Sequence, residues 1–413
     1  MQLKGPVRAM LTTGTCPEGQ VGARRCGGCP VGQVWWLAAA VGCAPGPGLV
    51  FEAPGTGTWT GGLAGTSGAG ATVEEEGGTG GPPGPPPATT DPAMTGGEES
   101  GGPNGVPALL VPAQADGWRW HTGAAPAGDW RADGFDASGW SAGQAPLLTG
   151  APLPATAGVV RLRRSFEIAG DPAGVGDLMV YVRRDDGAAI FLNGQEVGRS
   201  GLPLGGWGEG MTADGEAAGS DAERYFRAVV PGDALKAGEN VVAVGLHANQ
   251  ADADRGFDLQ LEVLDLGREP TDRMSVQVRT HSYGGEYGDD HVLAIWVERG
   301  GSFVKSLAVY GSERRDNLIA WSDAADGNTL DAVTGATRKR HQTHVVAWDL
   351  TDLAGQPAPP GAYTLRVEFT EDDSNSGAPA GPTVAVPFAL GGGPKVVPVA
   401  ADPRFRDWLV ISP

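Results

Sequence analysis

The chain has 413 residues, of which 68 are Gly and 33 are Pro, and this content of helix-interrupting residues excludes a long helical bundle or coiled coil. The formal net charge of -19 argues against a general nucleic-acid binder, because phosphate recognition requires a basic surface. The hydrophobic content of 40% suffices to bury a core, and no apolar run is long enough to predict a membrane-spanning helix.

Residues 1–43 are expected to form a secretory signal. Arg24 and Arg25 precede an uncharged apolar run that ends in small residues at Cys43, which is the order typical of an exported precursor. Residues 40–43 (A-V-G-C) resemble a bacterial lipobox. The resemblance implies cleavage before Cys43 and lipidation of its thiol, so that the membrane is reached through a lipid anchor only. The alternative is a short buried helix with a stray cysteine.

Residues 44–110 are expected to form a disordered linker. They contain 19 Gly and 11 Pro in 67 positions, and their aromatic residues are Phe51 and Trp59 alone. Such a composition cannot bury enough surface to offset chain entropy. We therefore expect a tether that holds the folded part away from a membrane surface.

Residues 111–267 alternate short apolar runs with Gly, Asp and Asn turns, which predicts strands joined by tight hairpins. The order of motifs is W-R-W-H at 118–121, D-W-R-A-D-G-F-D-A-S-G-W at 129–140, V-R-R-D-D-G-A-A-I-F-L-N-G-Q-E-V at 182–197 and G-E-N-V-V-A-V-G-L-H-A-N at 238–249. This order resembles the galactose-binding-like jelly-roll module that is appended to secreted bacterial phosphoesterases.

A sugar site in this module would use Trp207 for stacking and Asp186, Asn193 or His247 for hydrogen bonds. The alternative for Asp186 and Asn193 is a purely structural role in turns, where Asx residues bind backbone groups. Loop carboxylates could also hold a structural Ca²⁺, whose ligands would be scattered in sequence.

Residues 273–392 resemble a bacterial periplasmic domain family of uncharacterised function, which is encoded beside membrane-bound flavin reductase-like proteins. The resemblance rests on Y-G-G-E-Y at 283–287, A-I-W-V-E at 294–298, F-V-K-S-L at 303–307 and D-A-V-T-G-A-T-R at 331–338. Residues 348–368 also resemble the last hairpin of an immunoglobulin-like sandwich. Residues 393–413 are expected to form a C-terminal tail. The fold class is therefore all-β, with a jelly roll followed by an immunoglobulin-like sandwich.

The segment 331–337 resembles the motif at which a periplasmic transferase attaches FMN to threonine through a phosphoester. The resemblance implies that Thr337 is the acceptor and that Asp331, Thr334, Gly335 and Ala336 are recognised by the transferase. Arg338, with the adjacent Lys339 and Arg340, would place positive charge beside the phosphate. The alternative is a β-turn whose Thr and Asp side chains cap local backbone groups.

Other residues of this region are expected to be structural. The pairs His281 with His291 and His341 with His344 have spacings that could bind a metal, but solvated or turn histidines are the favoured interpretation. Core packing is expected for three tryptophans that could otherwise flank a flavin: Trp296, Trp321 and Trp348. Alternation along the strand allows Lys305 to point to solvent.

The sequence thus predicts an exported, lipid-anchored protein of the bacterial periplasm or cell envelope that carries covalent FMN in extracytoplasmic electron transfer. Its expected partners are an FMN transferase and a membrane flavin reductase-like protein. An electron carrier or a binding protein is favoured over an enzyme, and a hydrolase is the weakest interpretation because no nucleophile-base pair or metal cluster can be assembled from the spacing of residues. The alternative is a non-catalytic glycan-binding or adaptor protein of the cell envelope with no flavin.

Overall fold

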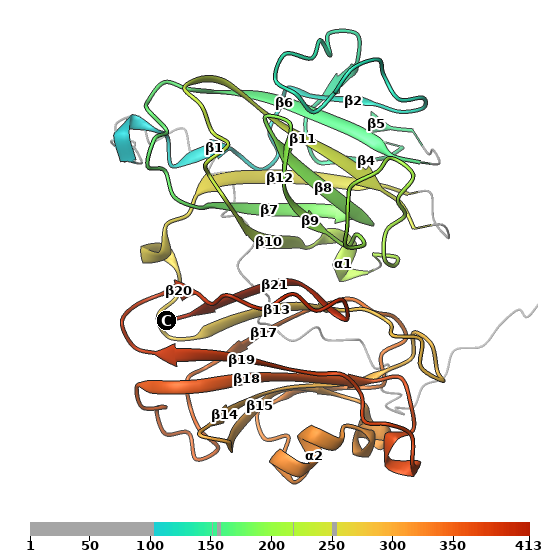
Figure 1. Ribbon diagram of the computed structural model, residues 1–413, viewed down its shortest axis with the longest axis vertical. Coiled ribbons are helices and arrows are strands. Elements are labelled where there is room, and N and C mark those ends of the chain that lie inside the picture. Colours follow the sequence, from blue (N-terminus) through green and yellow to red (C-terminus); the bar gives the residue numbers. More distant parts are fainter. Residues whose placement is uncertain (1–102, 151, 155–157, 218, 250–253) are drawn as a thin grey trace, which may run out of the picture. The chain divides into compact units, whose positions relative to one another are not determined.

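The computed structural model describes residues 103–413 except residues 151, 155–157, 218 and 250–253 (Figure 1). The predicted signal of residues 1–43, including Cys43, and the predicted linker up to residue 102 lie outside the described residues. The described residues form two successive β-sandwiches. The all-β class and the two-sandwich architecture that the sequence predicts are therefore confirmed.

The first sandwich contains two six-stranded sheets. One has the order β10-β7-β12-β4-β5, with β1 paired to β12, and the other has the order β3-β2-β6-β11-β8-β9. The strands of the first sheet are β1 (Leu109–Val111), β4 (Leu147–Thr149), β5 (Pro152–Leu153), β7 (Leu178–Asp185), β10 (Tyr225–Val230) and β12 (Gly256–Val263). Those of the second are β2 (Trp118–His121), β3 (Ser141–Gly143), β6 (Val160–Ile168), β8 (Gly187–Leu192), β9 (Gln195–Ser200) and β11 (Gly238–His247).

Alternation of side chains along these strands builds the core of the first sandwich. Val180 and Val182 of β7 pack in one cluster with Leu162 of β6 and with Val242 and Val244 of β11. Because successive side chains of a strand point to opposite faces, one face of each sheet contributes to this core.

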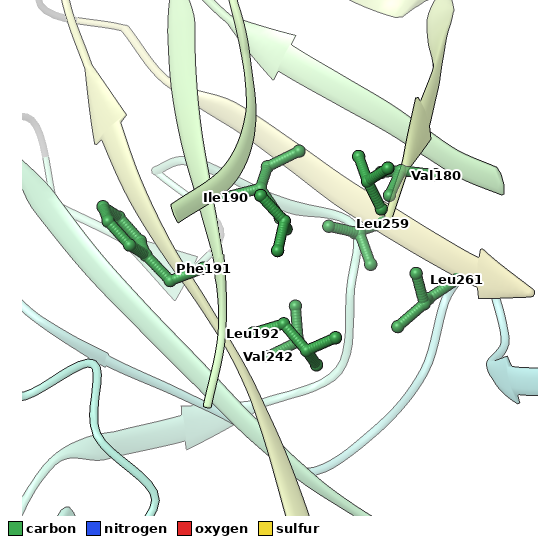
Figure 2. Close-up of a pocket in the computed structure, with 9 residues that line it drawn as sticks. Val180, Ile190, Phe191, Leu192, Val242, Leu259 and Leu261 are labelled. Atoms are coloured by element: carbon green, nitrogen blue, oxygen red, sulfur yellow. The ribbon is translucent and has the colours of Figure 1, made fainter. Parts of the chain in front are cut away.

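A small cavity inside this core is lined entirely by apolar side chains, among them Val180, Ile190, Leu259 and Leu261 (Figure 2). A ligand site needs a few polar groups that fix orientation, and an apolar cavity of this kind stays dry. We therefore interpret it as a packing gap and not as a binding site.

The second sandwich contains a four-stranded and a five-stranded sheet, with the orders β17-β13-β21-β20 and β16-β15-β14-β18-β19. The first comprises β13 (Met274–Thr280), β17 (Thr343–Trp348), β20 (Lys395–Val396) and β21 (Phe405–Ser412). The second comprises β14 (Val292–Arg299), β15 (Ser302–Tyr310), β16 (Val333–Gly335), β18 (Gly361–Thr370) and β19 (Thr383–Leu390). Val276, Leu293, Ile295, Leu365 and Val410 belong to the core between these sheets.

Helical segments of the described residues are short. They are α1 (Ser220–Glu223), α2 (Ile319–Ala325) and the 3₁₀ turns η1 (Pro103–Gly105), η2 (Leu266–Arg268), η3 (Ser312–Asn317) and η4 (Ser374–Ser376). Within residues 103–413, apart from the omitted positions, no helix has the length and apolar character needed to cross a membrane.

Two domain boundaries and one predicted hairpin differ from the sequence-based expectations. The expected tail contains β21, which pairs with β13 and buries Phe405 and Val410 in the core of the second sandwich. The expected linker overlaps β1, which pairs with β12 from Leu109 onward. The expected last hairpin does not exist, because β17 and β18 belong to opposite sheets and the segment between them crosses from one sheet to the other.

Candidate functional site

Thr337 follows the edge strand of the five-stranded sheet. β16 pairs in parallel with residues 308–310 of β15. Just after Thr337, the Arg338 N–H donates to the His291 carbonyl (2.8 Å) and the His291 N–H donates to the Arg338 carbonyl (2.9 Å). Ala336 and Thr337 therefore form a short link between two fixed stretches of backbone. The segment therefore consists of an edge strand, β16, followed by the short link of Ala336 and Thr337. It is not the β-turn that was the alternative interpretation.

Gly335 is required by the close approach of β16 to Tyr310. A Cβ added at Gly335 would lie 2.9 Å from Cδ1 of the Tyr310 ring, a distance that real Cβ atoms do not adopt. The Gly335 carbonyl also accepts a hydrogen bond from the Gly311 N–H (2.9 Å). Glycine at this position thus allows the acceptor segment to lie flat against the sheet.

The side chains of this segment are largely accessible. Val333 is 44% exposed, Thr334 and Ala336 are exposed, and Thr337 is half-buried. An edge strand also keeps one row of backbone groups free for pairing with another chain. A hydroxyl in this position can be reached by the active site of a second protein.

Asp331, at the start of the segment, is bound by a buried lysine. Lys305 is 3% exposed, and its Nζ lies 3.3 Å from Asp331 Oδ2, 3.0 Å from Asp349 Oδ2 and 2.9 Å from Thr351 Oγ1. The expectation that Lys305 points to solvent is wrong, because two carboxylates and a hydroxyl compensate its buried charge. The ion pair with Lys305 makes Asp331 an anchor of the segment.

Arg338 turns toward the protein rather than toward Thr337. Its guanidinium carbon lies 3.6 Å from the centroid of the Tyr310 ring, in a cation-π contact. Lys339 forms an ion pair with Asp290, and Arg340 lies 3.4 Å from Glu216. The three positive charges that follow Thr337 are present, but each already has a partner.

A pocket opens beside Thr337. Its lining includes Thr337 and the following residues of η3 and of the loops around it: Tyr287, Asp290, His291, Arg314, Asn317, Glu371 and Asp372. Cationic, anionic and aromatic groups alternate along its wall. The pocket volume is no more than about 180 Å³ with its open mouth included.

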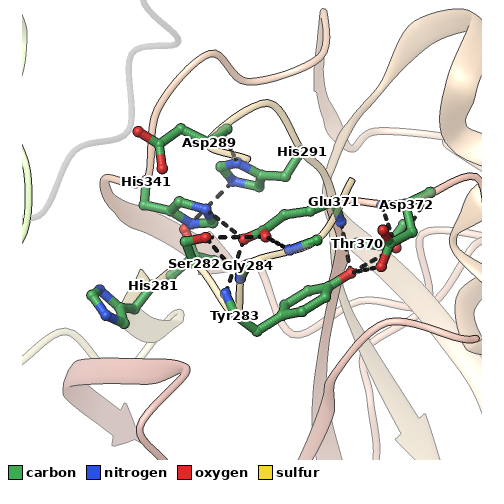
Figure 3. A network of polar contacts seen from close by, with 12 residues as sticks. His281, Ser282, Tyr283, Gly284, Asp289, His291, His341, Thr370, Glu371 and Asp372 are labelled. Atoms are coloured by element: carbon green, nitrogen blue, oxygen red, sulfur yellow. Dashed lines mark hydrogen bonds and ion pairs between the residues drawn. The ribbon is translucent and has the colours of Figure 1, made fainter. Parts of the chain in front are cut away.

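One wall of the pocket is a loop that Glu371, Asp372 and Asp373 hold in place, the last through the hydroxyl of Tyr287. Glu371 accepts hydrogen bonds from the Tyr283 N–H (3.2 Å) and the Gly285 N–H (2.7 Å), and Asp372 accepts one from the Tyr283 hydroxyl (2.8 Å). Figure 3 shows these contacts together with Ser282, whose hydroxyl also donates to Glu371. The Y-G-G-E-Y loop is therefore fixed by residues that follow β18.

Glu371 also contacts the histidines behind the pocket. It is 1% exposed, and its Oε1 lies 2.9 Å from His341 Nε2 (Figure 3). The His341 ring stacks on His291 with centroids 4.1 Å apart and planes inclined by 3°. His344 lies perpendicular to His291 and 5.6 Å from Tyr310. Glu371 and these histidines are far apart in the sequence, and the fold brings them close together near Thr337.

Burial keeps these imidazoles neutral. Burial lowers the pKa of His291 to about 4, assisted by the charge of Arg338, and lowers the pKa of His341 to about 2, assisted by the neighbouring His291. The pKa of the fully buried His344 also lies well below its usual range, for the same reasons. The expectation of solvated or turn histidines is wrong for His291, His341 and His344, which are 1–5% exposed.

Metal binding was the other open interpretation for these histidines. Among the residues that the structure describes, no group of three or more His, Cys, Asp or Glu side chains is arranged to hold a metal ion. His291 Nδ1 instead lies 2.9 Å from the Asp289 carbonyl oxygen, and its Nε2 lies 3.4 Å from Thr280 Oγ1. Both ring nitrogens of His291 therefore face protein partners.

In the first sandwich, Asp186 and Asn193 lie at opposite ends of β8. Asp186 is fully buried and accepts hydrogen bonds from the backbone N–H groups of Ala217 (2.7 Å) and Asn249 (2.6 Å). Asn193 has φ of 50° and accepts a hydrogen bond from the Val241 N–H (2.8 Å). Both side chains bind backbone groups of the protein itself, which is the structural role that was the alternative interpretation.

Trp207 and His247 do lie together. Trp207 Nε1 donates to His247 Nε2 (3.1 Å), and His247 Nδ1 lies 2.9 Å from the Met211 carbonyl oxygen. The Trp207 ring packs edge-on against Phe191 and Trp130 and remains half-buried. Asn193 follows β8, whereas Asp186 precedes it and His247 pairs with Gly187 at that same end, so Asn193 does not meet Asp186 and His247 in one site.

Several residues that line the pocket or bond to its lining had no place in the sequence-based site: Tyr283, Tyr287, Arg314, Glu371, Asp372 and Asp373. A signal for the acids existed, since three consecutive carboxylates directly follow an alternating strand. Their partners are about 60 to 90 residues away in sequence, so only the fold identifies them.

Comparison with known families bears on the second sandwich. Residues 273–381 match the model of a family described as "Predicted periplasmic protein (DUF2271)". The matched residues include β13 through β18, and therefore Thr337 and the pocket beside it. The match supports an exported, periplasmic protein. No curated protein matches the chain at a significant level.

Comparison with solved structures finds β-glucuronidases and a glycosyl hydrolase with low similarity to this chain. The chain is similar to a β-glucuronidase from glycoside hydrolase family 2, with 12% identity over 69% of this chain and 30% of that chain and a TM-score of 0.28. A family 2 glycosyl hydrolase from Bacteroides cellulosilyticus has 14% identity over 69% of this chain and 36% of that chain, with a TM-score of 0.26. A Bifidobacterium dentium β-glucuronidase has 14% identity over 70% of this chain and 48% of that chain, with a TM-score of 0.25. The chain thus spans less than half the length of each of these proteins. With identities and TM-scores this low, the activities of these proteins are not assigned to this chain.

Proposed function

We propose that the protein is a lipid-anchored protein of the bacterial cell envelope whose second sandwich carries FMN covalently on Thr337 and takes part in electron transfer outside the cytoplasm. Its partners in this role are an FMN transferase and a membrane flavin reductase-like protein. The observation that carries the proposal is the position of Thr337, a half-buried residue that follows an exposed edge strand and lines a pocket.

The attachment is a substitution at phosphorus. The Thr337 Oγ forms a bond to the phosphorus of FMN, and the bond that breaks joins this phosphorus to a nucleotide leaving group, as in FAD. The hydroxyl proton passes to a base of the transferase. No electron is gained or lost in this step, and the chain supplies only the hydroxyl and its orientation.

The surroundings of Thr337 suit a flavin on the protein surface. Pockets that enclose a ligand measure about 300–1,000 Å³. The pocket beside Thr337 is smaller, at no more than about 180 Å³. A flavin on Thr337 would therefore lie across the rim, where partner proteins can reach it. When bound, FMN supplies the redox chemistry, and the protein sets its position and electrostatics.

The short link at Ala336 and Thr337 supports the same role. The backbone hydrogen bonds at Gly335 and at Arg338 hold both ends of the link. The hydroxyl is thus presented at a fixed place on the sheet edge, while the neighbouring small side chain of Ala336 leaves room for a second active site.

The test is co-expression with a periplasmic FMN transferase, followed by intact-mass measurement and visible absorbance of the denatured protein. We expect a mass increase of one FMN and flavin absorbance that survives denaturation. Thr337→Val removes the hydroxyl at nearly constant volume and should abolish both signals. The matched control is Thr329→Val, which changes a half-buried threonine just outside residues 331–337 and should retain them. An unmodified mass in the wild type contradicts the proposal.

The lipid anchor has a separate test, because Cys43 lies outside the described residues. Labelled palmitate should be incorporated into the wild type and not into Cys43→Ser. Equal incorporation into both proteins contradicts the anchor and leaves the flavin proposal unaffected.

A further inference from the structure

Tyr287 is an unusual aromatic residue on the surface of the second sandwich. Among the residues that the structure describes, it is the single Trp, Tyr or Phe in the exposed class, at 36% exposure. It also lines the same pocket as Thr337. An exposed aromatic ring beside an acceptor hydroxyl is a candidate binding surface, because large exposed aromatic groups serve recognition.

The Tyr287 ring is held in place although it is exposed. Its hydroxyl donates to Asp373 Oδ2 (2.6 Å), and its backbone N–H donates to the Glu371 carbonyl (2.9 Å). The Arg314 guanidinium lies 4.2 Å from the ring centroid and donates to Asp373 Oδ1 (2.5 Å). Arg314, Tyr287 and Asp373 thus form a closed set of contacts, and a ring that is already ordered loses little entropy on binding.

The other aromatic residues near Thr337 are not available for stacking. Trp296, Trp321 and Trp348 are 0–1% exposed, so the expectation that they pack the core holds and they cannot contact a flavin. Tyr310 is 9% exposed, so little of its ring is accessible. Among the described aromatic residues of this pocket, Tyr287 alone offers an accessible ring.

We propose that Tyr287 is the stacking surface for the isoalloxazine ring of the flavin carried by Thr337. This inference rests on the proposed function, and it adds the position of the isoalloxazine ring on the protein. The ribityl phosphate separates the ring from Thr337 Oγ, so the ring settles at a distance from the acceptor and not directly above it. An offset stack on the phenol ring, which Arg314 and Asp373 hold in place, fixes the flavin across the pocket rim.

The test uses the FMN-loaded protein and two substitutions of Tyr287. Tyr287→Phe retains the ring and loses the hydroxyl, whereas Tyr287→Leu removes the ring at a position that is 36% exposed. Urea denaturation of both variants checks that the fold is kept. Flavin fluorescence anisotropy decay reports whether the isoalloxazine is fixed to the protein or rotates on its tether. We expect a fixed flavin in the wild type and in Tyr287→Phe. In Tyr287→Leu we expect a fast rotation and a several-fold higher flavin emission, because the phenol no longer quenches it.

Intact mass separates the two proposals. Full FMN loading with the same anisotropy decay and emission in the wild type and Tyr287→Leu overturns the stacking inference and leaves the flavin on Thr337. Absence of FMN from the wild type overturns both. Leu330→Ala is the matched control, since it removes another exposed apolar side chain, 52% exposed, near the acceptor segment and should leave anisotropy and emission unchanged.

Discussion

The ammonium of Lys305 lies 3.3 Å from the carboxylate of Asp331, so a buried cation on β15 anchors the segment that leads to Thr337. The same ammonium contacts Asp349 and Thr351 in the connection after β17. A single side chain therefore ties the acceptor segment to a second loop of the same sandwich.

Lys305→Met is expected to destabilise the second sandwich and to slow FMN attachment. The substitution keeps the aliphatic stem but removes the hydrogen bonds of the ammonium to exposed carboxylates and a hydroxyl, for which we expect a total loss of about 1.5–3 kcal/mol. Urea denaturation should show a loss of unfolding free energy in this range. Asp331→Asn changes the partner that is 61% exposed, and it should cost less than 1 kcal/mol. Equal losses for both variants would contradict the anchoring role of the buried lysine.

Stability is expected to fall as the pH decreases below 6.5. The folded pKa of His291 is about 4, below its ordinary value of 6.5, so the unfolded chain binds more protons between these two pH values. Stability is therefore complete above pH 6.5 and decreases toward pH 4, by about 1.4 kcal/mol per pH unit for each such histidine. Urea denaturation at pH 7 and pH 5 measures the difference.

The control for this pH dependence is a pair of variants. His291→Gln should reduce the slope, because it removes one buried imidazole that must charge. Thr334→Val alters an exposed side chain of the same sandwich that does not titrate, and it should keep the wild-type slope. A wild-type stability that stays constant from pH 7 to pH 5 would show that the buried imidazoles do not resist protonation.

Gly335→Ala is expected to displace the acceptor segment. The added Cβ would lie 2.9 Å from the Tyr310 ring, against which Arg338 and His344 also pack, so we expect the strand and not the ring to move. Overpacking of this kind costs about 1–3 kcal/mol. Thermal denaturation should show the loss, together with slower FMN attachment. Gly139→Ala, where a Cβ meets no atom within 4 Å, is the matched control and should be neutral. Equal stability of both variants would contradict the close approach of β16 to Tyr310.

Asp186→Ala is expected to destabilise the first sandwich without affecting any sugar binding. It leaves the backbone N–H groups of Ala217 and Asn249 without their carboxylate acceptor. A hydrogen bond to a buried charged group contributes about 1.5–3 kcal/mol, so a loss of at least this size should appear in urea denaturation. If instead the variant is as stable as the wild type but loses affinity on a glycan array, Asp186 is a sugar ligand and its structural role is wrong.

Strand positions were predictable because alternation and turn chemistry are local. Residues 178–182 and 188–192 are apolar runs on either side of D-D-G, and they form β7 and β8. Asn193 and Gly194 have the positive φ values of 50° and 90° that an Asn-Gly hairpin requires. β21 escaped prediction because it pairs with β13, more than a hundred residues earlier in the chain, and its short pattern has no neighbouring hairpin partner.

The candidate site was predictable in part, for a similar reason. The segment that ends at Thr337 is contiguous and could be identified from its residues. The contacts of Glu371 with Gly285 and His341, and of Lys305 with Asp331, join residues on different strands and loops. The sequence alone does not show which of these residues are close in space. The burial of the histidines and the contact of Lys305 with Asp331 could therefore be identified only from the structure.

The most direct test of the central proposal is peptide mapping of protein purified from its native membrane. Tryptic cleavage after Arg315 and Arg338 yields one peptide whose hydroxyl side chains are Ser322, Thr329, Thr334 and Thr337. Fragmentation should place one FMN phosphoester on Thr337. An unmodified peptide, or an FMN on any of the other three residues, would contradict the assignment of Thr337 as the flavin acceptor.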